Sequence, residues 1–246
     1  MRASALEFRL RMMINFAIIL LGIWAPWQAT ASRRVLLEWL PLQLSRVGWT
    51  SFSVAVPAVI VLASLFAALG ALLRVWGTAY LGPATVNSLA MKAGAVVADG
   101  PYRYVRNPLY LGLWFMAGAL AFLMPPSGAL LTMVLITIFL VRLTLGEESF
   151  LAARLGSPYH EFLRAVPRFL PRLRNHVPAS GARPRWLRAM LAELTPIGIF
   201  IAIAFVSWSY NGALMARVIL VSFGVSLVVR AFMPSATPQL PSTPEA

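Results

Sequence analysis

The chain has 246 residues, of which 59% are hydrophobic and only 12% are charged. Such a composition, with few charges over long runs, excludes an ordinary soluble globular protein and indicates an all-α, polytopic membrane protein. The net charge of +13 comes almost entirely from arginine, and cytoplasmic loops of membrane proteins collect basic residues. We therefore expect the lipid bilayer as a partner and no nucleic acid, because no soluble segment carries a basic fold or an aromatic platform.

Cysteine is absent, and His160 and His176 are the only two histidines. Disulfides, thiolate nucleophiles and thiolate metal sites are therefore excluded, and a histidine-rich metal site is not expected. The sequence predicts a protein without a bound metal and leaves its oligomeric state open.

The first apolar run along the chain is 12–31, and it follows Arg2, Arg9 and Arg11. We predict that it is a retained first span. The alternative is a cleaved signal peptide that ends at Ala29-Thr30-Ala31.

The second predicted span lies within 47–73, because no charge occurs between Arg46 and Arg74. Pro57 falls near its start, where proline is tolerated better than at the centre of a helix. A basic loop follows this span.

The third span is predicted to begin at Asn107-Pro108, because asparagine is a strong N-cap and proline is favoured at the first helical position. It runs to Met124, and the uncharged turn 125–128 then leads into the fourth span. Together the two spans form a short helical hairpin.

The chain becomes polar and basic after Gly146. The pattern predicts a short helix over 147–155, a stop at Gly156 and a second short helix that restarts at Ser157-Pro158. The apolar face of this second helix is formed by Tyr159, Phe162, Leu163 and Val166. We expect the helix to rest on the membrane surface or to cover the hairpin.

Two further spans, at about 196–210 and 213–230, share an uncharged turn and bring the expected total to about six. The proline-rich tail is expected to be disordered. The predicted organisation has five parts: N-terminal spans (1–69), a core with the hairpin (70–172), a basic linker (173–193), an accessory membrane hairpin (194–232) and the tail (233–246).

The charges of the loops predict the orientation in the membrane. The loops after the second and fourth spans are rich in arginine, whereas those after the third and fifth spans carry no charge. We therefore expect both termini and the basic loops to lie in the cytoplasm, with the protein in the bacterial inner membrane.

Counting outward from Pro126 predicts which residues of the hairpin lie at the same depth. Tyr110 lies 16 residues before Pro126, and Arg142 lies 16 residues after it. Because each helical residue rises about 1.5 Å, equal counts predict equal depth, which also sets Arg106 and Asn107 level with Gly146 and Glu147. The two polar clusters should therefore meet on the cytoplasmic side.

Arg142 is expected to lie inside the cytoplasmic edge of the hydrocarbon core. Its distance from Ser127 along the helix is about 21 Å, against a core of about 30 Å. A charge at such a depth usually faces a cavity and marks function. The alternative is that Arg142 extends to lipid phosphates as an anchor.

Three motifs in this part of the chain resemble one enzyme superfamily. They are Arg106-Asn107-Pro108-Leu109-Tyr110 at the start of a span, Glu147-Glu148 after the next span, and the segment from Leu155-Gly156 to Val166-Pro167. Their order and spacing are similar to those of the isoprenylcysteine carboxyl methyltransferase and phospholipid methyltransferase superfamily. The resemblance covers about residues 70–172.

The resemblance implies a membrane-embedded methyltransferase that uses S-adenosylmethionine, with an active site that faces the cytoplasm. It implies cofactor contacts from Val96, Val97, Tyr102, Asn107, Pro108, Leu109, Tyr110 and Glu147. The candidate catalytic residues are Arg142, Arg106 and Glu148. Among these, Arg142 is the nearest match to an arginine that binds the acceptor in carboxyl-methylating relatives.

The residue types suit this chemistry. A carboxylate such as Glu147 can accept a hydrogen bond from a ribose hydroxyl or an amine of the cofactor, and an arginine can hold a carboxylate. Methyl transfer is an in-line displacement, so positioning supplies much of its rate. A carboxylate acceptor needs no base, whereas an amine must first lose a proton, for which Glu148 is the nearest candidate.

Three functions follow from these observations. Carboxyl methylation of a prenylated or other lipid-like acceptor is favoured, and phospholipid N-methylation is the alternative, because asparagine at the position of Asn107 also occurs in N-methylating relatives. A non-catalytic membrane protein or transporter is the third possibility. Transporters usually contain internal repeats with helices broken at mid-span, and the sequence has no convincing repeat.

Overall fold

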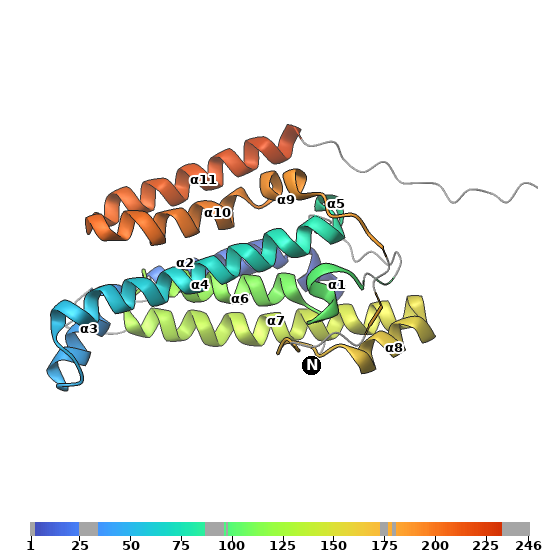
Figure 1. The fold of residues 1–246 in the computed structure, drawn as a ribbon, viewed down its shortest axis with the longest axis horizontal. Coiled ribbons are helices and arrows are strands. Elements are labelled where there is room, and N and C mark those ends of the chain that lie inside the picture. The colour runs from blue at the N-terminus through green and yellow to red at the C-terminus, as the bar shows by residue number, and fades with distance from the viewer. Residues whose placement is uncertain are drawn as a thin grey trace, which may run out of the picture.

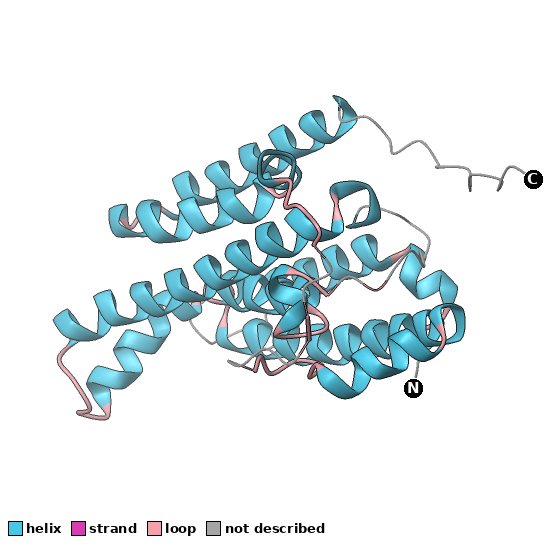
Figure 2. Cartoon of the chain, turned by 45° about the vertical axis from the view of Figure 1, so that its right-hand side comes forward, coloured by secondary structure: helices cyan, strands magenta, loops and turns pink. Residues whose placement is uncertain are grey.

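The described part of the chain is entirely helical. The computed structural model describes residues 3–24, 34–86, 96, 98–172, 177–178 and 181–232, and no strand occurs among them (Figure 2). The predicted all-α class is therefore confirmed. The predicted tail, 233–246, lies outside the described residues.

Three helices are long and apolar enough to cross a membrane: α4 (Phe52–Leu81), α7 (Pro126–Leu155) and α11 (Gly212–Phe232). A fourth crossing is possible if α9 (Trp186–Ala192) and the helical segment Leu194–Ser209, which meet at a bend of 70°, count as one span. The shorter apolar helices are α2 (Arg11–Trp24) and α6 (Pro108–Ala121). These six segments fall where spans were predicted, but the two short ones rise only about 21 Å each, so a count of six full spans is not confirmed.

The remaining described elements are short. They are α1 (Ala5–Arg9), α3 (Leu36–Arg46), α5 (Pro83–Val86), η1 (Gly100–Arg103), α8 (Ser157–Ala165), α10 (Leu194–Ile201), the π-helical turn η2 (Ala202–Val206) and η3 (Ser207–Ser209). Helix α9 lies within the stretch that the sequence predicts to be a linker.

The helices are arranged around α4. Figure 1 shows α10 and α11 along one side of α4, and α6 and α7 along the other. Helix α2 packs against α7. One apolar cluster lies between α4, α6 and the α10–α11 pair, and a second lies between α2, α6 and α7.

Glycine residues allow the backbones of α4 and α6 to pack closely against each other. A Cβ atom added to Gly70 of α4 would lie 2.9 Å from the backbone nitrogen of Met116. On α6, a Cβ atom added to Gly112 would lie 3.1 Å from the carbonyl oxygen of Gly70. Small residues allow the backbones of membrane helices to pack closely in this way.

Helix α6 ends earlier than predicted, and another segment binds the turn that follows it. The third span was predicted to reach Met124, but the helix ends at Ala121. The backbone nitrogens of Leu36 and Leu37 of α3 donate to the carbonyl oxygens of Met124 and Phe122, at 2.7 and 2.9 Å. Helix α3, which the sequence analysis did not predict, therefore supports this end of the hairpin.

Two predicted breaks do not occur. Helix α7 continues without interruption through Glu147 to Leu155, where a separate short helix was expected, and α4 continues past Arg74 to Leu81. In both places the sequence changes in polarity but contains no residue that stops a helix. The helices end only at Gly156 and Gly82, which adopt positive φ angles of 63° and 87°.

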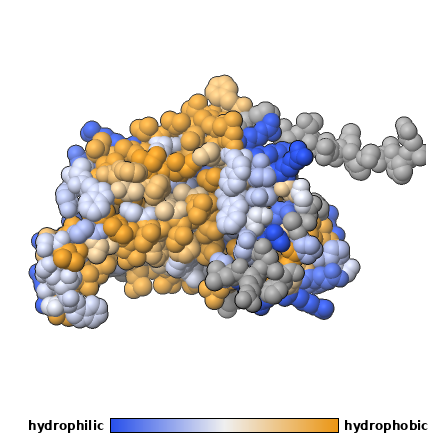
Figure 3. Space-filling view, in the orientation of Figure 1, coloured by the Kyte–Doolittle hydropathy of each residue, from blue (hydrophilic) through white to orange (hydrophobic). Residues whose placement is uncertain are grey.

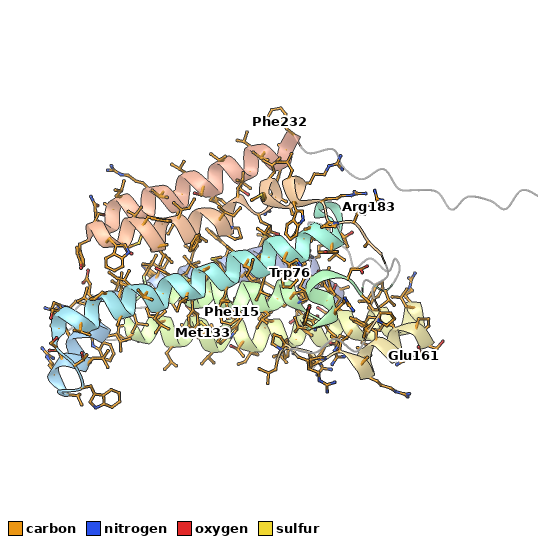
Figure 4. The ribbon with its side chains drawn as sticks, in the orientation of Figure 1. Trp76, Phe115, Met133, Glu161, Arg183 and Phe232 are labelled. Atoms are coloured by element: carbon orange, nitrogen blue, oxygen red, sulfur yellow. The ribbon has the colours of Figure 1, made fainter. Side chains whose placement is uncertain are left out.

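Polar and apolar residues are separated along the long axis of the molecule. Figure 3 shows hydrophobic residues over most of the length of the bundle and hydrophilic residues gathered at one end. We call this the polar end; α4 ends there, α6 begins there and α7 ends there. Figure 4 shows Phe115 and Met133 within the apolar length and Glu161 at the polar end.

Candidate active site

The two polar clusters of the hairpin meet at the polar end, as the residue counts predict. Helix α6 begins at Pro108, directly after Asn107, and α7 carries Glu147 and Glu148 in its last turns. The side chain of Asn107 donates from Nδ2 to Oε1 of Glu148 over 3.1 Å. This contact joins the start of one hairpin helix to the end of the other.

Glu148 is the centre of a charged network. Its side chain is only 7% exposed and forms ion pairs with Arg168 over 2.8 Å and with Arg106 over 3.4 Å. Both carboxylate oxygens therefore have positively charged or amide donors around them. Burial lowers the pKa of Arg106, and the nearby charge of Glu148 partly opposes this effect.

Asn107 does not cap its helix in the predicted way. It occupies the N-cap position, but its side chain makes no capping hydrogen bond. Instead the amide donates to Glu148 and, over 3.3 Å, to the carbonyl oxygen of Arg168. The predicted N-cap position is correct, but the two hydrogen bonds of Nδ2 orient the side chain toward Glu148 and Arg168, and its oxygen makes no capping bond.

Tyr110 and Glu147 form a second pair beside this network. The hydroxyl of Tyr110 donates to Oε2 of Glu147 over 2.8 Å. Tyr110 lies in the first turn of α6, and its side chain reaches across the hairpin to α7. The residue counts set Tyr110 level with Arg142, so its pairing with Glu147, five residues further along α7, was not predicted.

Tyr102 presents a buried hydroxyl group without a partner. The residue is 7% exposed, and Oη has no hydrogen-bond partner among the described residues. Burial raises the pKa of Tyr102, and the negative charge of Glu147 raises it further. An unpaired buried hydroxyl is costly, so this group fits the polar part of a bound ligand. The side chains of the site therefore suit a cofactor that carries hydroxyl and amine groups.

Glycine on α4 makes room for this part of the site. A Cβ atom added to Gly77 would lie 2.8 Å from Cδ2 of Leu109 and 3.5 Å from the hydroxyl of Tyr102. Leu109 and Tyr102 thus lie directly against α4. Pro108 is buried at the first position of α6.

Val96 lies on the side of the site that α8 covers. It packs against a cluster formed by Ala98, Tyr159, Phe162 and Val166. The predicted apolar face of α8 is therefore turned toward the end of the hairpin and the loop before η1, which supports the covering position rather than a position on the membrane surface. Val97 lies outside the described residues.

The segment after α8 forms backbone hydrogen bonds with the residues that follow η1. The backbone nitrogen of Arg106 donates to the carbonyl oxygen of Pro167 over 2.9 Å, and that of Arg172 donates to Tyr104 over 3.0 Å. Further along, the carboxylate of Asp99 accepts hydrogen bonds from the backbone nitrogens of Gly181 and Ala182. Gly181 and Ala182, which precede α9, thus also contact the beginning of η1.

Arg142 has a partner that the sequence did not predict. Its guanidinium binds the carboxylate of Glu7 in α1 over 2.8 Å, and both side chains are about one-third exposed. The backbone nitrogen of Ser4 and the Arg142 guanidinium hold the pKa of Glu7 below its usual value. Arg142 is therefore paired with the N-terminal helix α1.

Three charged residues of this end were missed: Arg168, Glu7 and Arg11. Arg168 had a usable signal, because a buried pair of carboxylates requires nearby positive charge and Arg168 follows Val166-Pro167 directly. No signal in the sequence indicated that Glu7 and Arg11 lie at this end, because the position of α1 depends on tertiary packing. Among the described residues, no cluster of histidine, aspartate or glutamate could hold a metal ion.

Comparison with known proteins agrees with this site. Residues 58–157 match the family model of the phospholipid methyltransferases, which is less than half of the chain but includes most of α4, the whole hairpin and Glu147-Glu148. The match confirms the resemblance that the motifs carry. No curated protein and no solved structure matches the chain.

Proposed function

We propose that this membrane protein, which is similar over its central part to the phospholipid methyltransferases, transfers a methyl group from S-adenosylmethionine to a lipid-like acceptor. The observation that carries the proposal is the group formed by Tyr102, Tyr110 and Glu147 within the matched part of the chain. The buried Tyr102 hydroxyl has no hydrogen-bond partner among the described residues, and Tyr110 orients the carboxylate of Glu147, whose charge raises the pKa of Tyr102.

These side chains would hold the polar part of the cofactor. Oε2 of Glu147 is bound to Tyr110 over 2.8 Å, and the carboxylate still has lone pairs to accept a ribose hydroxyl or an amine. The Tyr102 hydroxyl is a second donor or acceptor in the same region. S-adenosylmethionine supplies a methyl group on a cationic sulfur, and the protein would contribute orientation and exclusion of water.

Glu148 and its partners would position the site instead of carrying out a chemical step. Asn107, Arg106 and Arg168 already surround the carboxylate. The network joins the beginning of α6, the end of α7 and the segment after α8. Its proposed role is to hold the covering segment over the cofactor.

Two acceptors are candidates: a carboxylate and a phospholipid amine. Carboxyl methylation is favoured by the sequence argument, in which Arg142 would hold the acceptor carboxylate. The pairing of Arg142 with Glu7 over 2.8 Å is a specific observation in favour of the second candidate, N-methylation of a phospholipid amine, because a carboxylate acceptor would have to displace Glu7. For an amine acceptor, the base would need to come from Glu147, the acceptor itself or solvent.

The proposed location is the bacterial inner membrane with the polar end in the cytoplasm. The positive-inside tendency supports this orientation, because the polar end carries Arg103, Arg106, Arg164 and Arg168. A lipid-like acceptor would then reach the site laterally from the inner leaflet.

The proposal is tested by binding of labelled S-adenosylmethionine to the purified protein in lipid nanodiscs. The wild type should bind, and Glu147→Ala and Tyr110→Ala should bind at least about tenfold more weakly, the equivalent of one lost charge-assisted hydrogen bond. Failure of the wild type to bind at about 1 mM, the upper end of common enzyme constants, would support the non-catalytic alternative.

The acceptor is identified in a second step. Membranes from cells that express the wild type are extracted after labelling with methyl-labelled cofactor, and the labelled lipids are treated with mild base. Base hydrolyses a methyl ester but leaves an N-methyl group intact, so the two candidates give opposite results.

A further inference from the structure

The N-terminal helices lie beside the candidate site although they precede the part of the chain that matches the family. Phe8 of α1 is buried in the same apolar cluster as Leu143 of α7, and Tyr110 packs against that cluster. The backbone nitrogen of Ala3 donates to the carbonyl oxygen of Arg142 over 3.1 Å. The junction of α1 and α2 therefore packs beside the Tyr110–Glu147 pair.

Arg11 is the buried charge at this junction. The residue is only 8% exposed, which is unusual for an arginine at the first position of an apolar helix. Its Nη1 donates to the carbonyl oxygen of Phe8, and its Nη2 donates to the carbonyl oxygen of Val86, each over 3.0 Å. The guanidinium also lies over the ring of Phe8, 4.1 Å from its centroid.

These two carbonyl groups lie in the final turns of two short helices, α1 and α5. The last carbonyl groups of a helix have no partner within it, and a cation there is favourable. The planar guanidinium can satisfy two separate oxygens at once. Arg11 thus joins the N-terminal helices to α5, a link between residues 75 positions apart.

The same guanidinium lies near the candidate cofactor residues. It contacts the carbonyl oxygen and the ring of Phe8, and Phe8 is buried in the cluster against which Tyr110 packs. One side chain therefore joins α1 to Val86 of α5 beside the residues that border Tyr110.

We propose that Arg11 is a positioning residue of the candidate active site, which fixes α5 at Val86 against the N-terminal helices, next to Tyr110, so that the cofactor can bind. This inference rests on the proposed function. It assigns a role to a residue outside the part of the chain that resembles the family, and it predicts that the N-terminal helices are required for binding and not only for membrane insertion.

The test compares Arg11→Gln and Arg11→Lys with Arg9→Gln, in which an exposed arginine of the same segment is changed. Two quantities are measured in nanodiscs: the dissociation constant of labelled S-adenosylmethionine, and amide hydrogen exchange in the peptide that contains Val86. Exchange in peptides from α11 serves as the internal reference for global stability.

We expect Arg11→Gln to weaken cofactor binding about tenfold, as for loss of a charged hydrogen-bond donor, and to speed exchange in the Val86 peptide while exchange in α11 is unchanged. Arg11→Lys should keep the charge but restore protection only in part, because an ammonium lacks the planar pair of donors. Arg9→Gln should match the wild type in both measurements.

Binding by Arg11→Gln within twofold of the wild type, or weakened binding with unchanged exchange at Val86, would overturn the proposal. Should Arg11→Gln fail to fold, the same two measurements on Arg11→Lys decide the question. If the wild type does not bind the cofactor, the proposed function is wrong. Amide exchange in the Val86 peptide of wild type and Arg11→Gln then tests only whether Arg11 holds Val86 in place.

Discussion

Glu147 and Glu148 are neighbours in the sequence but have opposite surroundings. Glu148 is enclosed by two arginines and an amide, whereas the described hydrogen bond of Glu147 comes from the neutral hydroxyl of Tyr110. A 100° turn of the helix separates the two side chains. This difference assigns Glu148 to holding the covering segment and leaves Glu147 suited to contact a polar ligand.

Removal of the Tyr110 hydroxyl tests this distinction. Tyr110→Phe deletes the 2.8 Å hydrogen bond to Glu147 but keeps the ring that packs between the hairpin helices. We expect cofactor affinity to fall about tenfold, since a hydrogen bond to a charged group contributes on the order of 1.5–3 kcal/mol. Isothermal titration in nanodiscs measures the change.

The matched control is Tyr210→Phe, because Tyr210 is 74% exposed in the turn before α11. It should bind the cofactor like the wild type. Equal affinities of Tyr110→Phe and wild type would remove Tyr110 from the site.

At the scale of single elements, the side chain of Glu7 is one of the contacts that hold α1 against the bundle. Glu7 closes a capping box with Ser4 and binds Arg142. Because these donors lower its pKa below the ordinary value of 4.5, ionised Glu7 favours the docked state above that value. The contribution disappears as the pH falls through the lowered pKa.

Glu7→Gln should therefore have the same effect at neutral pH as protonation of Glu7, because it removes the negative charge. We expect faster amide exchange in α1 in this variant, with no further change when the pH is lowered from 7 to about 5, just above the ordinary pKa of glutamate. The wild type should keep its protection over this interval. Glu161→Gln, a change at an exposed glutamate of α8, is the control, and an α1 that exchanges equally fast in all three proteins would contradict the proposed docking.

The contact between α4 and α6 depends on the absence of side chains. Gly70→Val should lower the free energy of unfolding by about 1–3 kcal/mol, as for overpacked cores, because even the Cβ atom would lie 2.9 Å from a backbone nitrogen of α6. Thermal unfolding in detergent measures the effect. Gly224→Val is the matched control, because a Cβ atom there meets nothing within 4 Å, and an equal loss in both variants would show that helix propensity alone explains the result.

At the scale of the whole molecule, a buried ion pair fastens the C-terminal hairpin to the core. Glu193, at the 70° bend between α9 and α10, accepts from Arg74 over 2.7 and 2.8 Å and from Thr78 over 2.7 Å. Arg230 of α11 donates to the carbonyl oxygen of Ala192 beside it. These contacts explain how α4 continues past a charge, and they join α9–α11 to the helix that borders Tyr102.

Glu193→Ala should therefore be strongly destabilising, because it leaves Arg74 buried without its carboxylate. Breaking a buried pair typically costs about 3–5 kcal/mol, which thermal unfolding in nanodiscs can resolve. Arg74→Met combined with Glu193→Met should be less damaging than Glu193→Ala alone. A double variant that is as unstable as the single one would argue against this ion pair as the source of the loss.

The sequence by itself determined the helical class, the hairpin and the meeting of its polar clusters, because helix rise and the positions of Pro126 and Gly156 are local properties that residue counts capture. It also carried the family resemblance through the motifs around Asn107 and Glu147. Tertiary structure decided the rest. Arg142 pairs with Glu7, Arg11 donates to the carbonyl oxygen of Val86, and Arg74 pairs with Glu193; these partners come from segments distant in the chain. A buried charge requires an opposite charge or a hydrogen-bonding group, but only the packing of the helices selects which one.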